Sequence, residues 1–330
     1  MIKQQTVGVV IPCYRVKNHI QAVIASIPPF VDHIICVDDR CPEDSGAFIQ
    51  EMVVDPRVVV VRHEVNQGVG GAMLTGYQHA TASGCDIMVK IDGDGQMDCC
   101  IMEHFIHPIV EGVADYTKGN RFWHLSHARQ MPIIRFFGNV VLSLMTKASS
   151  GYWRVFDPTN GYTAIHSRTF SQLPVDTIAK RYFFESDMLH HLGLIRAVVL
   201  DIPMLAKYGD EVSGLKIRKI VFDFLFRHSR NVLRRVWYQY FLRDFNYGTI
   251  CLLLGISTLT CGTVFGLTKW FHGLQTGTFA SSGTVAIVLL LLLTGFYFIL
   301  SFFRVDMEEF QHFPLFRYLP KTKAKQDGDS

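Results

Sequence analysis

The sequence predicts an α/β protein in which a mostly parallel sheet precedes a pair of membrane-spanning helices. Two observations predict this fold. Short apolar runs rich in β-branched residues recur about every 25 residues in the first part of the chain, with helix-length segments between them. Two long stretches near the C-terminus contain no Asp, Glu, Lys or Arg. The first pattern is typical of a sheet covered by helices, and the second is typical of spans through lipid.

The apolar runs occupy residues 7–11, 34–37, 58–61 and 87–91. Between them, residues 18–27 and 72–82 are expected to form helices, the first of them capped by Asn18. Apolar strands that alternate with helices indicate a parallel sheet with helices on both faces. Such sheets bind ligands beyond the carboxyl ends of their strands, so the residues that follow each run form the candidate site.

The composition is that of a folded chain with a local excess of apolar residues. Of 330 residues, 49% are hydrophobic and 18% are charged, and there are 32 Lys and Arg against 29 Asp and Glu. These values exclude a disordered chain and a collagen-like repeat. Residues 1–213 carry a net charge of −4, whereas residues 214–246 carry +6. The sequence therefore predicts an acidic globular domain followed by a basic segment.

Charged residues are absent from 248–268 and from 270–303. Each stretch reaches the roughly 20 residues that a helix needs to cross about 30 Å of hydrocarbon. The alternative is a pair of buried core helices, but a soluble domain rarely buries two such segments in succession. We expect a transmembrane hairpin over residues 247–303, with spans at about 248–268 and 283–303.

Basic residues flank the hairpin on both sides, whereas its turn holds a single lysine. The positive-inside rule then places residues 1–213 and the tail, residues 304–330, on the cytoplasmic face of the membrane.

The N-terminus has no apolar run with a cleavage site, so nothing in it predicts export of the N-terminal part. The eight cysteines include no Cys-x-x-Cys pair, so we expect neither zinc nor disulfides.

The basic segment 214–246 is expected to form amphipathic helices at the membrane surface. Its aromatic and aliphatic residues recur at helical spacing, and its arginines share another face. An ordinary surface helix is the alternative, and we expect no nucleic acid as partner because lipid phosphate already explains the charge. The apolar positions are Phe222, Phe226, Leu233 and Trp237, and the basic ones are Arg227, Arg230 and Arg234.

Polar or aromatic residues follow three of the four predicted strands. The first is followed by Pro12-Cys13-Tyr14, the second by Asp38-Asp39 and the fourth by Asp92-Gly93-Asp94-Gly95-Gln96. Two carboxylates one residue apart at a strand end can hold a divalent cation such as Mg²⁺. The same Asp-Gly-Asp tripeptide recurs at 327–329 in the tail, so its position gives the first copy its significance. The alternative is a solvated acidic turn.

Taken together and in order, these motifs resemble those of family 2 inverting glycosyltransferases, which have the GT-A fold. With the hairpin, the chain is similar to the polyprenyl-phosphate glycosyltransferases, a group that includes dolichyl-phosphate mannose synthase and undecaprenyl-phosphate glucosyltransferases. The resemblance covers residues 7 to about 216. Its motifs lie at residues 9–14, 35–39, 66–72, 90–96, 119–122 and 157–162.

The resemblance implies a role for each matching position. Pro12, Tyr14, Asp38 and Asp39 would bind the nucleotide of the donor, together with Asp92 and Gln96. Asp92, Asp94 and Gln96 would hold Mg²⁺ or Mn²⁺ beside the diphosphate. Arg121, Arg135, Asn139, Lys207 and Lys216 would bind the acceptor phosphate. The chain departs from the family at Arg15-Val16-Lys17, where acidic residues are usual, and at Arg40-Cys41, where Gly-Ser is usual.

The glycine-rich stretch at residues 66–72 matches neither the dinucleotide fingerprint nor a Walker-type phosphate loop. It is interpreted either as a loop that caps the following helix or as part of the donor site. The resemblance also makes a homo-oligomer an expected state.

The expected function is inverting transfer of a sugar from a UDP- or GDP-sugar to polyprenyl phosphate by an integral membrane protein. A phosphate acceptor is already dianionic at neutral pH, so it needs no general base. One alternative is transfer to a hydroxyl of a lipid-linked saccharide, which requires a carboxylate base. Another is a non-catalytic anchor that binds nucleotide sugars. Asp157 is a candidate catalytic residue with Asp92 and Asp94, or else a structural turn, and Glu185 and Asp187 are further candidate bases.

Overall fold

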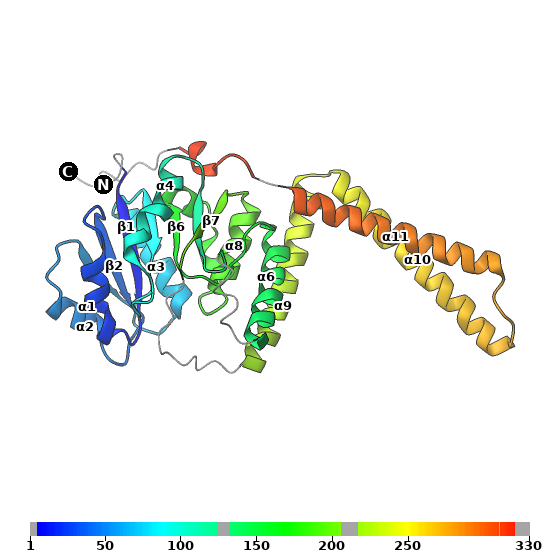
Figure 1. Cartoon of the computed structure of the whole chain (residues 1–330), viewed down its shortest axis with the longest axis horizontal. Helices are drawn as coiled ribbons and strands as arrows, with labels where there is room; N and C mark the ends of the chain where they lie inside the picture. The colour runs from blue at the N-terminus through cyan, green and yellow to red at the C-terminus, as the bar shows by residue number, and fades with distance from the viewer. Residues whose placement is uncertain (1–4, 124–132, 206–216, 310, 321–330) are drawn as a thin grey trace. The chain divides into compact units, whose positions relative to one another are not determined.

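The computed structural model describes residues 5–123, 133–205, 217–309 and 311–320 (Figure 1). The chain forms two compact units. The first comprises Met1–Val232 together with Gln311–Ser330, and the second comprises Leu233–Phe310. The first unit contains the sheet and the second contains the apolar helices.

The first unit is built on a seven-stranded sheet with the order β3-β2-β1-β4-β6-β5-β7. Neighbouring strands are parallel except at β6, which is antiparallel to both β4 and β5. This confirms the predicted α/β class and its mostly parallel sheet. The strands are β1 (Val7–Cys13), β2 (His33–Asp38), β3 (Val58–Arg62), β4 (Ile87–Lys90), β5 (Tyr116–Asn120), β6 (Thr163–His166) and β7 (Val199–Pro203).

Helices cover both faces of this sheet because alternate strand residues point to opposite sides. In β1, Val9 and Ile11 enter one hydrophobic core, whereas Val10 enters the other. The first core is closed by α1 (Lys17–Ser26), α2 (Ser45–Met52) and α4 (Met102–Val110). The second is closed mainly by α3 (Val69–Ala82), α7 (Ser167–Phe170) and α8 (Phe184–Leu194).

All four predicted apolar runs are strands, but the predicted cap of the first helix is wrong. Helix α1 begins at Lys17, its N-cap is Val16, and no side chain caps it. The carbonyl of Val16 accepts the first helical hydrogen bond from Ile20 at 2.9 Å. Val16 is buried in the first core, so packing rather than the polar side chain of Asn18 fixes where this helix starts.

Two longer helices complete the first unit, α6 (Ile133–Ser150) and α9 (Ile217–Val236), and α9 continues past the boundary between the units. Helix α9 has a buried polar side, on which Asn231 donates to Asp187 at 2.8 Å. Phe222 and Phe226 are 74% and 70% exposed. The helix is therefore amphipathic with exposed aromatic rings, and its contact with a membrane surface stays a prediction.

The second unit consists of a π-helical turn at Trp237–Arg243 and two antiparallel helices, α10 (Tyr247–Thr276) and α11 (Ser282–Glu308). By length and composition both helices can cross a membrane. They pack closely at glycines, since a Cβ on Gly295 would come within 2.6 Å of Leu259. Helix α10 extends further than predicted and ends at Gly277, whose φ of 66° is left-handed.

Candidate active site

A cavity of about 390 Å³ opens at the carboxyl ends of β1, β2 and β4. This is the sheet edge at which ligands of parallel sheets bind. Four of the residues predicted to bind the nucleotide line it, namely Pro12, Tyr14, Asp39 and Asp92. Asp94 lines the same cavity. The structure therefore brings the three predicted strand ends together in one place.

Asp92, the first aspartate after β4, lies beside a buried lysine that the sequence pattern did not identify as a site residue. Lys90 Nζ is 3.0 Å from Asp92 Oδ1 and 3.2 Å from Glu185 Oε1. Burial acts to lower the pKa of Lys90, but the Asp92 and Glu185 carboxylates outweigh burial and the pKa is raised. A Cβ on Gly161 would lie 2.5 Å from Nζ, so a larger residue there would crowd this cluster.

The acidic pair has the chemistry of a small divalent-cation site. Asp94 Oδ1 accepts a hydrogen bond from the backbone of Gln96 at 2.9 Å, which holds the turn closed. Within the described residues, no group of three or more His, Cys, Asp or Glu side chains could hold a metal ion. Mg²⁺ commonly takes only one or two carboxylates, with water and substrate phosphate as its other ligands. Asp92 and Asp94 therefore fit such an ion, whereas the side chain of Gln96 does not line the cavity.

The paired aspartates at the end of β2 hold loops in place. Asp38 is buried and accepts from the backbone nitrogens of Cys41 at 2.8 Å and Gly46 at 2.7 Å. Asp39 is buried and accepts from the backbone of Gln67 at 2.8 Å and Gly68 at 2.7 Å. Of the two, only Asp39 lines the cavity. A direct contact of either carboxylate with the nucleotide stays a prediction.

The glycine-rich loop connects the cavity to a distant segment of the chain. Gly68 is the N-cap of α3, has a φ of +89° and lines the cavity. The backbone of Gly71 donates to Lys180 O at 3.0 Å. A Cβ on Gly70 would lie 2.6 Å from Ala179 O. The loop therefore caps a helix and also lies at the cavity, and its role in the donor site stays a prediction.

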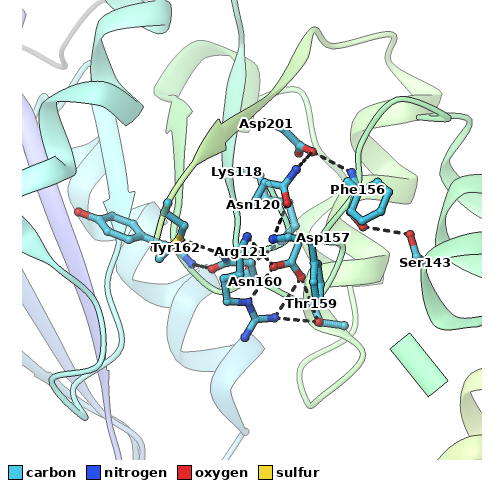
Figure 2. A network of polar contacts seen from close by, with 12 residues as sticks. Lys118, Asn120, Arg121, Ser143, Phe156, Asp157, Thr159, Asn160, Tyr162 and Asp201 are labelled. Atoms are coloured by element: carbon cyan, nitrogen blue, oxygen red, sulfur yellow. Dashed lines mark hydrogen bonds and ion pairs between the residues drawn. The ribbon is translucent and has the colours of Figure 1, made fainter. Parts of the chain in front are cut away.

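A second polar cluster surrounds Arg121, at the end of β5 (Figure 2). Arg121 Nε donates to Asp157 Oδ2 at 2.8 Å, and a terminal nitrogen of the same guanidinium donates to Oδ1 at 3.0 Å. Asp157 is fully buried, while about a third of the Arg121 side chain is exposed. The sequence predicted either a catalytic residue or a structural turn at Asp157, whereas the structure pairs Asp157 with Arg121, and a catalytic role of Asp157 stays a prediction.

Asp201 belongs to this cluster and was not predicted. Its Oδ2 accepts from Asn120 Nδ2 at 3.0 Å and from the backbone of Phe156 at 2.8 Å. Burial raises the pKa of Asp201 to about 6. In the same cluster, Lys118 Nζ donates to Asn160 O, and burial lowers the pKa of Lys118 to about 8. Lys118 lies in β5 and Asp201 in β7. A charged residue within a buried strand is the signal that could have identified them.

The remaining predicted site residues lie on α6, on α8 or outside the described residues. Arg135 lies on α6, but its side chain is outside the described residues, as are Lys207 and Lys216 entirely. Asn139 lies one turn after Arg135 on α6 and is partly buried. Glu185 pairs with Lys90, as described above. Asp187 is buried and accepts from the backbone of Ala179 at 2.8 Å as well as from Asn231.

The mostly parallel sheet, with an acidic cavity at its carboxyl edge, is consistent with the GT-A fold that the motifs imply. The chain belongs to the family described as "Glycosyl transferase family 2", whose model matches residues 8–173. This confirms the family that the motifs resembled.

Two curated relatives and one solved structure illustrate the similarity. The UDP-N-acetylglucosamine--dolichyl-phosphate N-acetylglucosaminyltransferase of Methanococcus voltae is 30% identical over 52% of this chain and 74% of its own length. The polyprenol monophosphomannose synthase of Mycolicibacterium smegmatis is 25% identical over 65% of this chain and 83% of its own. Mannosyl-3-phosphoglycerate synthase from Rubrobacter xylanophilus superposes with a TM-score of 0.51 at 17% identity, covering 73% of this chain and 77% of that one. The last similarity concerns the fold alone.

Proposed function

We propose that the protein is a membrane-bound glycosyltransferase that moves one sugar from a nucleoside diphosphate to polyprenyl phosphate, with inversion at the anomeric carbon. The observation that carries this proposal is the cavity at the sheet edge, where Asp92 and Asp94 lie together with Tyr14. The names of the relatives support the lipid phosphate as acceptor. Two helices that can cross a membrane support the location.

The donor would bind with its diphosphate at the acidic pair. A Mg²⁺ or Mn²⁺ ion held by Asp92 and Asp94 would supply Lewis acidity to the diphosphate leaving group. Lys90 keeps Asp92 in place through their 3.0 Å contact. Tyr14 is 46% exposed, so its ring is available for stacking on the nucleotide base.

The acceptor would bind at Arg121. A phosphate monoester has a second pKa of about 6, so it is largely dianionic at neutral pH and attacks without a base. The forked guanidinium of Arg121 suits a phosphate, and Asp157 holds that fork in one orientation. Polyprenyl phosphate resides in the membrane, and the apolar helices would keep the enzyme where its acceptor is concentrated.

The contacts of the carboxylates favour this acceptor over a sugar hydroxyl. A hydroxyl acceptor requires a carboxylate that can take up a proton. Asp157 faces Arg121, Glu185 faces Lys90, and Asp187 accepts from two donors. Each candidate base is thus engaged by a cation or by hydrogen-bond donors. We further propose, from the basic flanks of the hairpin, that the catalytic unit lies on the cytoplasmic face.

Transfer by the purified full-length chain tests the proposal directly. The chain would be given Mg²⁺ or Mn²⁺, a polyprenyl phosphate and a panel of UDP-, GDP- and dTDP-sugars, with nucleoside diphosphate release and lipid product as readouts. We expect Asp94→Asn to lower turnover about 100-fold or more, because it removes a charged ligand from the leaving-group site.

Asp329→Asn is the matched control, since it changes the same residue in the second Asp-Gly-Asp tripeptide and should leave turnover unchanged. Normal turnover in the Asp94 variant, with an unaltered circular dichroism spectrum, would remove the argument for the cation site. Turnover of the wild-type chain with saccharide-lipid acceptors but not with polyprenyl phosphate would favour the hydroxyl alternative.

A further inference from the structure

The cavity that would hold the donor contains one cationic side chain among the described residues that line it, Arg181. The same lining includes three carboxylates, those of Asp39, Asp92 and Asp94. Arg181 is exposed, and within the described part of the chain its guanidinium has no hydrogen-bond or ion-pair partner. Its guanidinium can therefore donate to a ligand in this cavity without giving up a contact that the described residues make.

The backbone around Arg181 is fixed on both sides. Ala179 N donates to Asp187 at 2.8 Å, Lys180 O accepts from Gly71 at 3.0 Å, and Arg181 O accepts from Phe184 at 2.8 Å. These contacts tie the segment 179–182 to the first turn of α3 and to α8. The backbone position of Arg181 is therefore set by the fold.

The side chain of Arg181 lies over Gly68. A Cβ on Gly68 would come within 2.9 Å of Arg181 Cγ, so the absence of a side chain there makes room for the arginine stem. Gly68 and Val69 line the cavity at the N-terminus of α3, where the helix dipole favours negative charge. Arg181 thus reaches the cavity along the wall that is favourable to an anion.

The charges of the cavity indicate which ligand group needs this arginine. A diphosphate brings at least two negative charges next to carboxylates. Asp39 already accepts from the backbone of Gln67 and Gly68, and Asp92 is compensated by Lys90. A divalent cation would offset Asp94 and part of the diphosphate, which leaves anionic oxygens on the side away from the acidic pair. A guanidinium can donate to two phosphate oxygens at once.

We propose that Arg181 binds the diphosphate of the donor and stabilises the departing nucleoside diphosphate. This role rests on the proposed function. In the transfer step, an oxygen of the acceptor phosphate forms a bond to the anomeric carbon while the bond from that carbon to the diphosphate oxygen breaks. The electron pair of the broken bond goes to the diphosphate, and Arg181 meets the charge that develops there.

Binding of UDP and GDP, compared with uridine and guanosine, tests this assignment without turnover. The full-length chain with Mn²⁺ would be titrated by calorimetry, and the nucleosides by ligand-observed NMR. Arg181→Ala should weaken diphosphate binding on the order of 10- to 100-fold and leave nucleoside binding unchanged, because only the diphosphate contacts the arginine. Arg181→Lys should recover part of the loss.

Lys180→Ala provides the matched control. Lys180 is the adjacent cation, but its Nζ donates to Gln67 Oε1 at 3.1 Å and it does not line the cavity. Its removal should leave both affinities unchanged. Wild-type diphosphate affinity in Arg181→Ala, or an equal loss of nucleoside and diphosphate binding, would overturn the assignment. If the wild-type chain bound neither diphosphate, the proposed function itself would be rejected, and this role with it.

Discussion

Single buried charges organise the proposed acceptor site. Arg121 is oriented by Asp157, and the segment that carries Asp157 is held in turn by Asp201 through the backbone of Phe156 (Figure 2). Asn120 links Asp201 to the segment that follows β5, since its side chain donates to Asp201 and accepts from the backbone of Phe122. The orientation of the partly exposed Arg121 thus depends on Asp201, a carboxylate with which it has no hydrogen bond among the described residues.

Asp201 should make stability depend on pH. Its pKa is raised to about 6 by burial, and it faces Lys118, Lys147 and Asp157. A carboxyl whose pKa is raised in the folded state binds its proton more tightly there than in the unfolded chain. Its contribution to stability is therefore present below about pH 4 and is lost as pH rises through about 6.

We expect Asp201→Asn to remove this dependence. Relative to the variant, the wild-type chain should lose about 1–3 kcal/mol of unfolding free energy between about pH 4 and pH 6. Thermal unfolding of both chains across that range measures the difference, in which titrations common to both proteins cancel. Two curves that stay parallel would show that Asp201 is ionised throughout the range.

At the scale of elements, the sequence identified the strand ends but not the contacts that distant segments make there. The apolar runs located β1, β2 and β4, and the parallel arrangement then placed Tyr14, Asp39 and Asp94 at one edge. Contacts between distant segments had no such signal. Lys90 meets Glu185 across 95 positions, and Arg181 meets the glycine-rich loop across more than a hundred. A local pattern cannot predict such pairs, because they depend on which helix covers which strand.

The search for apolar runs also failed to predict strands β5 and β7, at the other end of the sheet. Strands β5 and β7 contain Lys118, Asn120 and Asp201, and these polar residues interrupt the apolar character that identified the first four strands. The same residues build the cluster around Arg121. The strands that were hardest to predict are therefore those that carry the proposed acceptor site.

The contact between the glycine-rich loop and segment 179–182 can be tested at Gly68. A methyl group there would meet Lys180 O at 2.7 Å and the Arg181 stem at 2.9 Å. We expect Gly68→Ala to destabilise the fold by about 1–3 kcal/mol and to weaken binding of nucleoside diphosphate. Denaturation and calorimetric titration measure the two effects.

Gly84→Ala separates crowding from backbone strain. Gly84 has a similar φ, +82° against +89°, but nothing lies within 4 Å of the position that a Cβ would take there. Both variants incur the cost of a left-handed alanine, whereas only Gly68→Ala displaces the segment that carries Arg181. Equal effects on donor binding in the two variants would mean that the loop does not position that segment.

At the scale of the whole molecule, the chain leaves the first unit at Val232 and rejoins it at Gln311. The second unit is thus connected to the first at both of its ends. The returning segment forms a short 3₁₀ helix at Leu315–Arg317, whose first two backbone nitrogens donate to Asp115 at 2.7 and 2.9 Å. Asp115 is fully buried and also accepts from Val198 and Thr169. A tail that was predicted only as a cytosolic extension therefore contributes to the core of the first unit.

We expect Phe316 to anchor this returning segment on the first unit. Its ring is 5% exposed, stacks on His166 with centroids 4.0 Å apart and lies under the guanidinium of Arg168. We expect Phe316→Ala to lower the unfolding free energy of the first unit by about 2–4 kcal/mol, since it leaves a cavity beside a buried imidazole. Tyr318→Ala, in the same segment but 71% exposed, should change it by less than about 0.5 kcal/mol.

Denaturant unfolding of the full-length chain, followed by limited proteolysis between α11 and the segment, compares the two variants. Equal stability of both would mean that the segment merely rests on the surface, whereas cleavage that appears only in Phe316→Ala would show that this ring holds the returning segment on the first unit.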